Sequence, residues 1–169
     1  MKRRGMMTAT LAAIPLIGMA AMTSAQPIND GELPALWDKW VAMWNGDLAM
    51  ADLIMAPDYK LHMSPIGGSD LSGYAGAAGM AGWIGQLHAA INPFVFEVQV
   101  QPLFGDGMIA GRWLASGIYQ GGFPGARAAP GTPVTFAGAD FLRIENGKVA
   151  EYWLSADQLD LLSQLEIMG

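Results

Sequence analysis

The sequence has no cysteine, few basic residues and only two histidines. Without cysteine the chain cannot form disulfides, thiolate nucleophiles or cysteine-based zinc sites. Nine basic residues against fifteen acidic ones give a net charge of −6, which disfavours nucleic acid as a partner because phosphate backbones are repelled. Two histidines without a local carboxylate cluster predict no metal site. Nucleophile elbows, dinucleotide-binding glycine fingerprints and phosphate loops are also missing, so we predict no cofactor.

The first 25 residues have the pattern of a secretory signal peptide. A basic start at residues 2–4 precedes an apolar run at 6–22, and small residues at 23–25 offer a cleavage point. The run is shorter than the ~20 residues that span a bilayer, so we expect no stable membrane anchor after processing; a retained signal anchor is the alternative. We predict an exported, periplasmic or extracellular domain at 26–169, with six basic and fifteen acidic residues.

The region after the signal predicts one α+β domain. Apolar residues first recur at helical spacing and later alternate, and Asn146-Gly147 is a strong hairpin turn. Helices first and long antiparallel strands afterwards favour helices packed on one face of a sheet. The expected helices are 36–44, 48–55, 73–90 and 158–165, and the expected strands are 58–63, 94–104, 108–119, 132–144 and 148–154.

The third expected helix carries a glycine every three residues, from Gly73 to Gly85. Each interior glycine costs a helix about 1 kcal/mol relative to alanine. One interpretation is a smooth stripe that packs closely against the sheet. The other is a loosely held helix that can lift from the edge of a pocket.

Several motifs make the sequence similar to the SnoaL-like polyketide (ester) cyclase family, a branch of the NTF2-like fold. They are Trp44-Asn45-Gly46-Asp47, Ala56-Pro57-Asp58-Tyr59 with His62, Gly117-Ile118-Tyr119-Gln120-Gly121, and the ending Asn146-Gly147-Lys148-Val149-Ala150-Glu151-Tyr152-Trp153. The resemblance covers nearly all of 26–169. It implies a cone: a curved antiparallel mixed sheet with three helices in the N-terminal half and a short C-terminal helix around a cavity. It also implies a homodimer formed through the sheet.

The resemblance implies two candidate positions for proton transfer, of which one has lost its chemistry. In the family's aldol cyclases a histidine and a carboxylate in the pocket manage the proton transfers, and their positions fall here on Asp140 and Leu154. Leucine neither takes nor gives a proton, so the family's mechanism cannot run unchanged. Asp140 lies on an apolar strand face, where burial would raise its pKa and suit it as a general base. The alternative is a structural aspartate bonded to a tryptophan or tyrosine.

The register of the last hairpin decides which residue faces Asp140. Counting strictly through a two-residue turn places Trp153 opposite Asp140 and on its face. The family alignment instead requires Leu154 to point inward, which needs a bulge near the turn. His62 and Tyr152 are candidate polar partners in catalysis, although a lone histidine such as His62 is also compatible with a structural role.

Aromatic residues supply the candidate ligand-binding wall. The resemblance places Trp44 at a first-helix position that lines the pocket in the cyclases. The other candidates are Tyr59, Trp83, Trp113, Phe136 and Trp153. Taken singly, each of the other tryptophans is better explained as ordinary core than as ligand wall, whereas aromatic walls with few polar groups are typical of pockets for small apolar ligands.

Three functions follow from these observations. The first is an exported protein that binds a hydrophobic small molecule and converts it by cofactor-free acid/base chemistry, as a cyclase, isomerase or lyase. The second is a non-catalytic binding protein, which Leu154 favours. The third is a structural partner protein that uses its sheet as a dimer face.

Overall fold

The structure, a computed structural model, describes residues 30–64 and 70–168, so the predicted signal peptide at 1–25 lies outside the described residues. Helices and strands follow the predicted order, which confirms the α+β class. The helices are η1 (Asp30–Glu32), α1 (Leu33–Trp44), α2 (Met50–Ile54), η3 (Ser72–Tyr74), α3 (Gly76–Ala90) and α4 (Gln158–Gln164). The strands are β1 (Met55–His62), β2 (Ile91–Gly105), β3 (Met108–Tyr119), β4 (Pro133–Glu145) and β5 (Lys148–Ala156).

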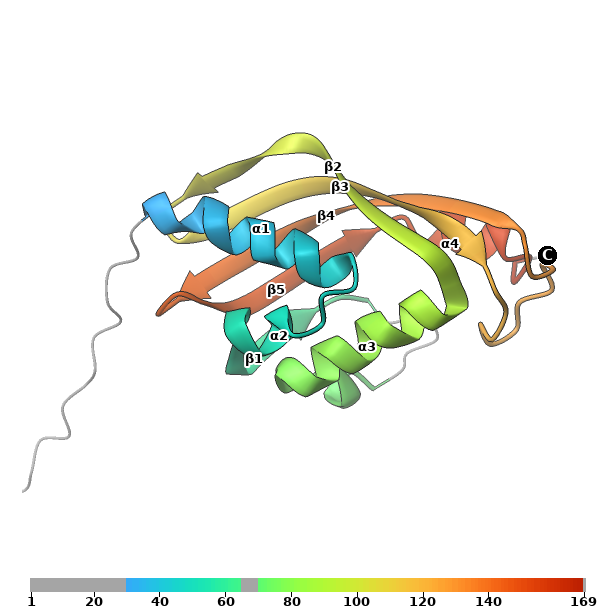
Figure 1. Cartoon of the computed structure of the whole chain (residues 1–169), viewed down its shortest axis with the longest axis horizontal. Helices are drawn as coiled ribbons and strands as arrows, with labels where there is room; N and C mark the ends of the chain where they lie inside the picture. The colour runs from blue at the N-terminus through green and yellow to red at the C-terminus, as the bar shows by residue number, and fades with distance from the viewer. Residues whose placement is uncertain (1–29, 65–69, 169) are drawn as a thin grey trace, which may run out of the picture.

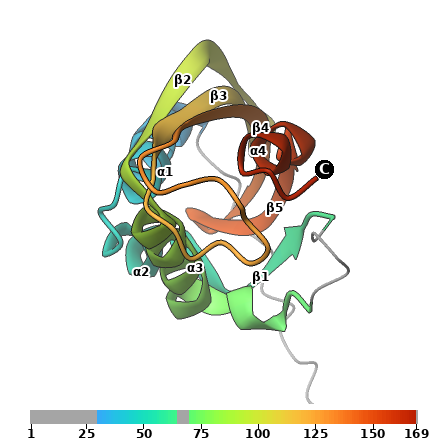
Figure 2. The ribbon, with the colours of Figure 1, turned by 90° about the vertical axis from the view of Figure 1, so that its right-hand side faces the viewer.

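The five strands form one mixed sheet in the order β1-β5-β4-β3-β2. Neighbours run antiparallel except β1 and β5, which are parallel. β1 begins at Met55, earlier than expected, and contains Pro57 because an edge strand tolerates the missing backbone donor of proline. Figure 1 shows α1, α2 and α3 on the concave side of the sheet, and the end-on view in Figure 2 shows the strands wrapping into a cone.

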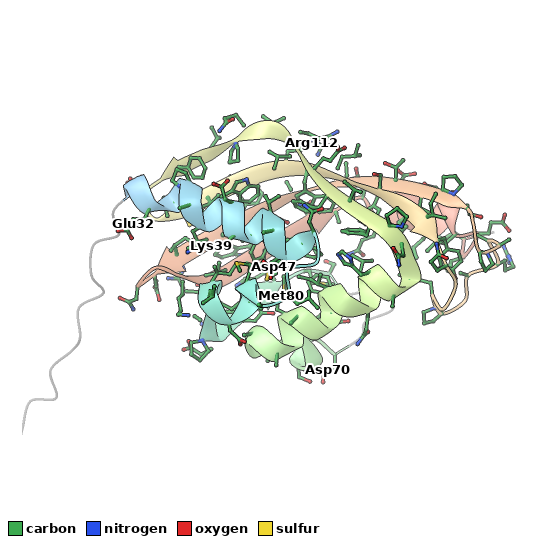
Figure 3. All side chains as sticks on the ribbon, viewed as in Figure 1. Glu32, Lys39, Asp47, Asp70, Met80 and Arg112 are labelled. Atoms are coloured by element: carbon green, nitrogen blue, oxygen red, sulfur yellow. The ribbon has the colours of Figure 1, made fainter. Side chains whose placement is uncertain are left out.

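α1 packs against the concave side because one of its faces is apolar. Its buried residues are Leu33, Leu36, Trp37, Trp40, Met43 and Trp44. Met80 of α3 is fully buried, with its sulfur 3.8 Å from the Tyr59 hydroxyl of β1, whereas Arg112 of β3 lies exposed on the outer side of the sheet (Figure 3). Within residues 30–64 and 70–168, no helix is long and apolar enough to cross a membrane.

The β4–β5 hairpin contains the bulge that the family alignment required. Asn146 and Gly147 both have positive φ, as a tight hairpin turn demands. The register then shifts between Arg143 and Ile144, which leaves Ala150 as an extra residue on β5. Leu154 therefore pairs with Asp140, and the strict count that placed Trp153 there is wrong.

Candidate functional site

A cavity of about 490 Å³ lies inside the cone, toward the end where β2 begins and the chain ends. Figure 2 shows this end, with the orange β3–β4 loop crossing it near α3 and α4. The described wall residues are Trp44, Met63, Tyr74, Trp83, Gln86, Leu87, Ala90, Phe94, Phe96, Trp113, Gly122, Phe123, Pro124, Phe136, Leu154, Ala156, Gln158, Leu161, Leu162 and Ile167. None of these is acidic, basic or a histidine. The wall is thus mainly apolar, with polar groups from two glutamine amides, one tyrosine and the tryptophan indoles.

Six wall residues form a continuous arc of aromatic rings, which we call the aromatic arc. In order of contact they are Tyr74, Trp83, Trp44, Phe96, Trp113 and Phe136. Successive ring centroids lie 5.1 to 5.8 Å apart. These separations are the ones at which aromatic pairs attract each other, so the arc is held by its own contacts as well as by burial.

The centre of the aromatic arc is fixed by two polar residues at the junction of α1 with β2 and α3. Asn45, which follows Trp44, donates to the Phe96 carbonyl at 3.0 Å and accepts from the Phe96 N–H at 2.9 Å. This pair holds the Trp44 and Phe96 rings stacked at 14°. His88 Nε2 lies 2.9 Å from the Trp44 carbonyl oxygen and secures the same end of α1 to α3.

Among the residues that the structure describes, Asp140 is the one charged residue that is fully buried. Its Oδ2 accepts from Trp40 Nε1 and its Oδ1 accepts from the Tyr152 hydroxyl, both at 2.9 Å. The Trp40 and Tyr152 rings also meet edge to face at 4.7 Å. The sequence prediction that Asp140 sits on an apolar inward face is confirmed, and Tyr152 is its partner.

Burial raises the pKa of Asp140 to about 6, while the hydrogen bonds from Trp40 and Tyr152 and the nearby Trp113 N–H act in the opposite direction. The Trp113 Nε1 is close enough to lower this pKa but does not complete a hydrogen bond, and like the buried Trp44 Nε1 it has no partner. Burial together with the Asp140 charge raises the pKa of Tyr152 well above its ordinary value.

Asp140 lies one side-chain layer behind the cavity wall. It is absent from the wall itself, but its strand neighbour Leu154 and its close neighbour Trp113 both line the cavity. The Trp113 ring covers Gly138, where a Cβ would lie 2.3 Å from that ring. Because Asp140 is fully buried and absent from the wall, its carboxylate can act on the cavity through its field but does not contact a ligand there.

His62 lies away from Asp140, on the outer side of the sheet. Its Nε2 is 2.7 Å from Glu151 Oε2, and its ring stacks on Trp153 at 4.7 Å. Arg143 donates to Glu151 and Glu145. The bonds to His62 and then Arg143 lower the pKa of Glu151. His62 therefore joins the edge strand β1 to β5, and the structure does not bring it together with Asp140.

The predicted ligand-binding residues divide into two groups. Trp44, Trp83, Trp113 and Phe136 line the cavity. Trp153 points outward as a result of the β4–β5 bulge, so it lies outside the wall. Tyr59 is buried beside the cavity, where its hydroxyl donates to the Tyr74 carbonyl and burial raises its pKa to about 12.

Sequence reasoning missed two rings of the aromatic arc, Tyr74 and Phe96. Alternation along β2 could have assigned Phe96 to the inward face together with Phe94. Tyr74 follows a loop and carries no such signal. Within the described residues, no group of three or more metal-ligating side chains is placed to hold a metal ion.

The chain belongs to the family described as SnoaL-like polyketide cyclase, whose sequence model matches residues 35–165. This match covers most of the chain and includes the inward strand faces and the aromatic arc. It confirms the resemblance drawn from the motifs at the ends of α1 and β5.

Solved structures confirm the NTF2-like fold. TsrD from Streptomyces laurentii is 21% identical, with a TM-score of 0.67 over 83% of this chain and 99% of that one. A SnoaL-like polyketide cyclase from Agrobacterium tumefaciens is 17% identical, with a TM-score of 0.60 over 79% and 97%. A protein with a ketosteroid isomerase-like fold from Catenulispora acidiphila, in complex with trimethylamine, is 18% identical, with a TM-score of 0.60 over 79% and 93%. A comparison with curated proteins finds no match.

Proposed function

We propose that this protein binds an apolar small molecule in its cavity and holds it without converting it. The observation that carries this proposal is the position of Leu154. It points inward where the family's aldol cyclases have a catalytic carboxylate, and the described wall residues include no carboxylate or imidazole to replace it. A mainly apolar cavity of about 490 Å³ has the size and character of a small-molecule site.

A binding experiment tests this function directly. The purified domain is titrated with neutral polycyclic aromatic and steroid-like compounds while tryptophan fluorescence is recorded, and the bound compound is recovered for mass spectrometry. We expect saturable quenching and recovery of unchanged ligand. Trp83→Ala, which removes a wall ring, should weaken binding at least tenfold, whereas Trp153→Ala on the outer face should not. A panel that leaves the fluorescence unchanged would overturn the proposal.

A second candidate is a cofactor-free acid/base enzyme, and Asp140 is the observation that favours it. A buried carboxyl whose pKa is about 6, next to Tyr152, is poised to exchange protons near neutral pH. The catalytic route would require Trp113 or Leu154 to move aside. The test is hydrogen–deuterium exchange beside the carbonyl of a bound ketone, followed by NMR. Exchange that the protein accelerates and that Asp140→Asn abolishes would favour the enzyme over the binder.

We also propose that the protein is exported and forms a homodimer. The pattern at residues 2–25 supports export, and N-terminal sequencing of the mature protein should begin at Gln26.

The outer sheet face supports dimerisation, because Phe141 is 45% exposed there beside Trp153 and opposite charges such as Glu97 and Arg112 accompany them. A face that carries apolar groups and both signs of charge can pair with its own copy about a two-fold axis.

A further inference from the structure

The hydrogen-bond partners of Asp140 suit an ionised carboxylate. Both of its oxygens accept, one from the Trp40 N–H and one from the Tyr152 hydroxyl. An indole N–H can only donate, so the Trp40 side offers nothing that could accept a carboxyl proton. The charge is shielded from solvent, because Asp140 is 0% exposed.

This negative charge is not neutralised from the cavity side. The described wall residues include no lysine, arginine or histidine. Arg143, three residues further along β4, belongs to the outer face and is engaged by Glu145 and Glu151. The Trp113 and Leu154 side chains lie next to Asp140 and also line the cavity, and in such a poorly polarisable interior a charge acts over several ångströms.

The aromatic arc adds to the same preference. Ring faces carry negative potential and attract ammonium groups, which is how aromatic cages hold quaternary amines. The polar side chains in the wall, Gln86 and Gln158, have amide oxygens that can accept from an ammonium N–H. The Asp140 charge, the ring faces and the amide oxygens therefore favour a cation over an anion.

We propose that the ligand of this cavity is an apolar amine bound as its ammonium cation, and that Asp140 sets this charge preference by acting through the aromatic wall. The inference rests on the proposed binding function and names the chemical class of its ligand. Asp140 is here a positioning residue, because it does not touch the ligand.

Three probes of one shape test the charge preference at pH 8. They share a 2-naphthylmethyl skeleton and carry a trimethylammonium group, its uncharged tert-butyl isostere, or a carboxylate. We expect the cation to bind about tenfold tighter than the isostere, and the carboxylate to bind weaker than both. A wild-type protein that binds the isostere as tightly as the cation overturns this inference and leaves the binding function intact. Failure of all three probes to bind overturns both.

Asp140→Asn separates the charge from the shape, because asparagine is isosteric and can still accept from Trp40. We expect the cation preference to fall to twofold or less while affinity for the uncharged isostere stays within twofold of wild type. Glu97→Gln, which removes an exposed carboxylate on the outer face, is the matched control and should leave the preference unchanged. A preference that survives in Asp140→Asn overturns the role of Asp140, and thermal unfolding verifies that the variant is folded.

The pH dependence gives an independent measurement, because a trimethylammonium group does not titrate. The titratable group that faces Asp140 is Tyr152 of β5, next to Tyr59 of β1; α1 and β3 present only the indoles of Trp40 and Trp113. Since the pKa of Asp140 is about 6, most of its charge is lost at pH 5. The cation preference should shrink severalfold between pH 8 and pH 5, and a constant preference would contradict the inference.

Discussion

Burial of Asp140 links the stability of this protein to pH. The carboxyl has a pKa of about 6 in the folded chain, about two units above its ordinary value of 3.8. The folded state therefore binds the proton more tightly than the unfolded state. The stabilisation that arises from the raised pKa of Asp140 is largest below pH 4, and it is lost as pH rises through 6.

Comparison of the wild type with Asp140→Asn isolates this effect, because all other titrating groups are shared. From pH 7 to pH 4 we expect the unfolding free energy of the wild type to rise relative to the variant by about 2 kcal/mol, somewhat less than the full pKa difference at 1.4 kcal/mol per unit, because the unfolded carboxyl is only partly protonated at pH 4. Urea unfolding at a series of pH values measures it. A difference that is flat, or that falls toward pH 4, would show that the carboxyl is not shielded as described.

The sequence predicted Asp140 better than the residues around it. Its apolar strand neighbours place it inside by simple alternation, and indole or tyrosine partners are what a buried carboxylate needs. Leu154 could be assigned inward only through the family alignment. The bulge at Ala150 shifts the register, and no residue near it indicates a bulge from the sequence alone. His62 was predicted as a catalytic partner because its contact with Glu151 joins residues 89 positions apart, and local sequence carries no sign of such a contact.

The glycines of α3 were predicted either to allow close packing or to loosen the helix. The structure shows close packing at one of these positions and open space at another. Close packing holds at Gly79, where a Cβ would lie 2.6 Å from the carbonyl carbon of Tyr74 and 2.9 Å from the Gly73 oxygen. The partner is thus the backbone around η3 rather than the sheet. Gly82 is exposed and a Cβ there would meet nothing within 4 Å.

Alanine substitutions should therefore change stability in opposite directions at these two positions. Gly82→Ala should stabilise the protein by about 1 kcal/mol, because alanine is the better helix former and nothing obstructs it. Gly79→Ala should destabilise it by about 1–3 kcal/mol, because the added methyl group collides with backbone. Thermal or urea unfolding of both variants measures these changes in stability, and each variant serves as the control for the other. Equal effects of the same sign would contradict this packing.

The junction of α1 with β2 also determines the geometry of the site. Asn45→Ala removes both hydrogen bonds to the Phe96 backbone and should cost about 1–2 kcal/mol of unfolding free energy. It should also weaken ligand binding, because the Trp44–Phe96 stack loses its support. Asn45→Asp keeps the acceptor and loses the donor, so we expect an intermediate effect in both urea unfolding and fluorescence titration. If Asn45→Ala bound the ligand with wild-type affinity, this junction would not support the binding site.

For the molecule as a whole, order and type of elements followed from periodicity, but the cone did not. Hairpin turns such as Asn146-Gly147 and the alternation of β3 and β4 predict an antiparallel sheet. Curvature arises from twist and register shifts spread over β2, β1 and β5, and these depend on packing rather than on local pattern. The same holds for the aromatic arc, whose six rings come from α1, η3, α3 and three strands.

The proposed homodimer is tested at the same scale. We expect the purified protein to sediment as a dimer, and Phe141→Glu to shift it to a monomer because a charge would be buried in the contact. Leu159→Glu is the control, since Leu159 is 68% exposed on α4 and lies off the sheet face. Analytical ultracentrifugation distinguishes the species. A wild-type monomer, or a dimer that persists in Phe141→Glu, would exclude this face.

The two ends of the chain differ in their relation to the ligand. Ile167, close to the C-terminus, lines the cavity together with Leu161 of the last helix, whereas α1 begins at the far end of the molecule (Figure 1). An affinity tag or a fusion partner attached after the last residue would crowd the chamber and compete with whatever enters it. Purification handles and surface-immobilisation chemistry for this protein consequently belong at the start of the mature domain, directly before Gln26.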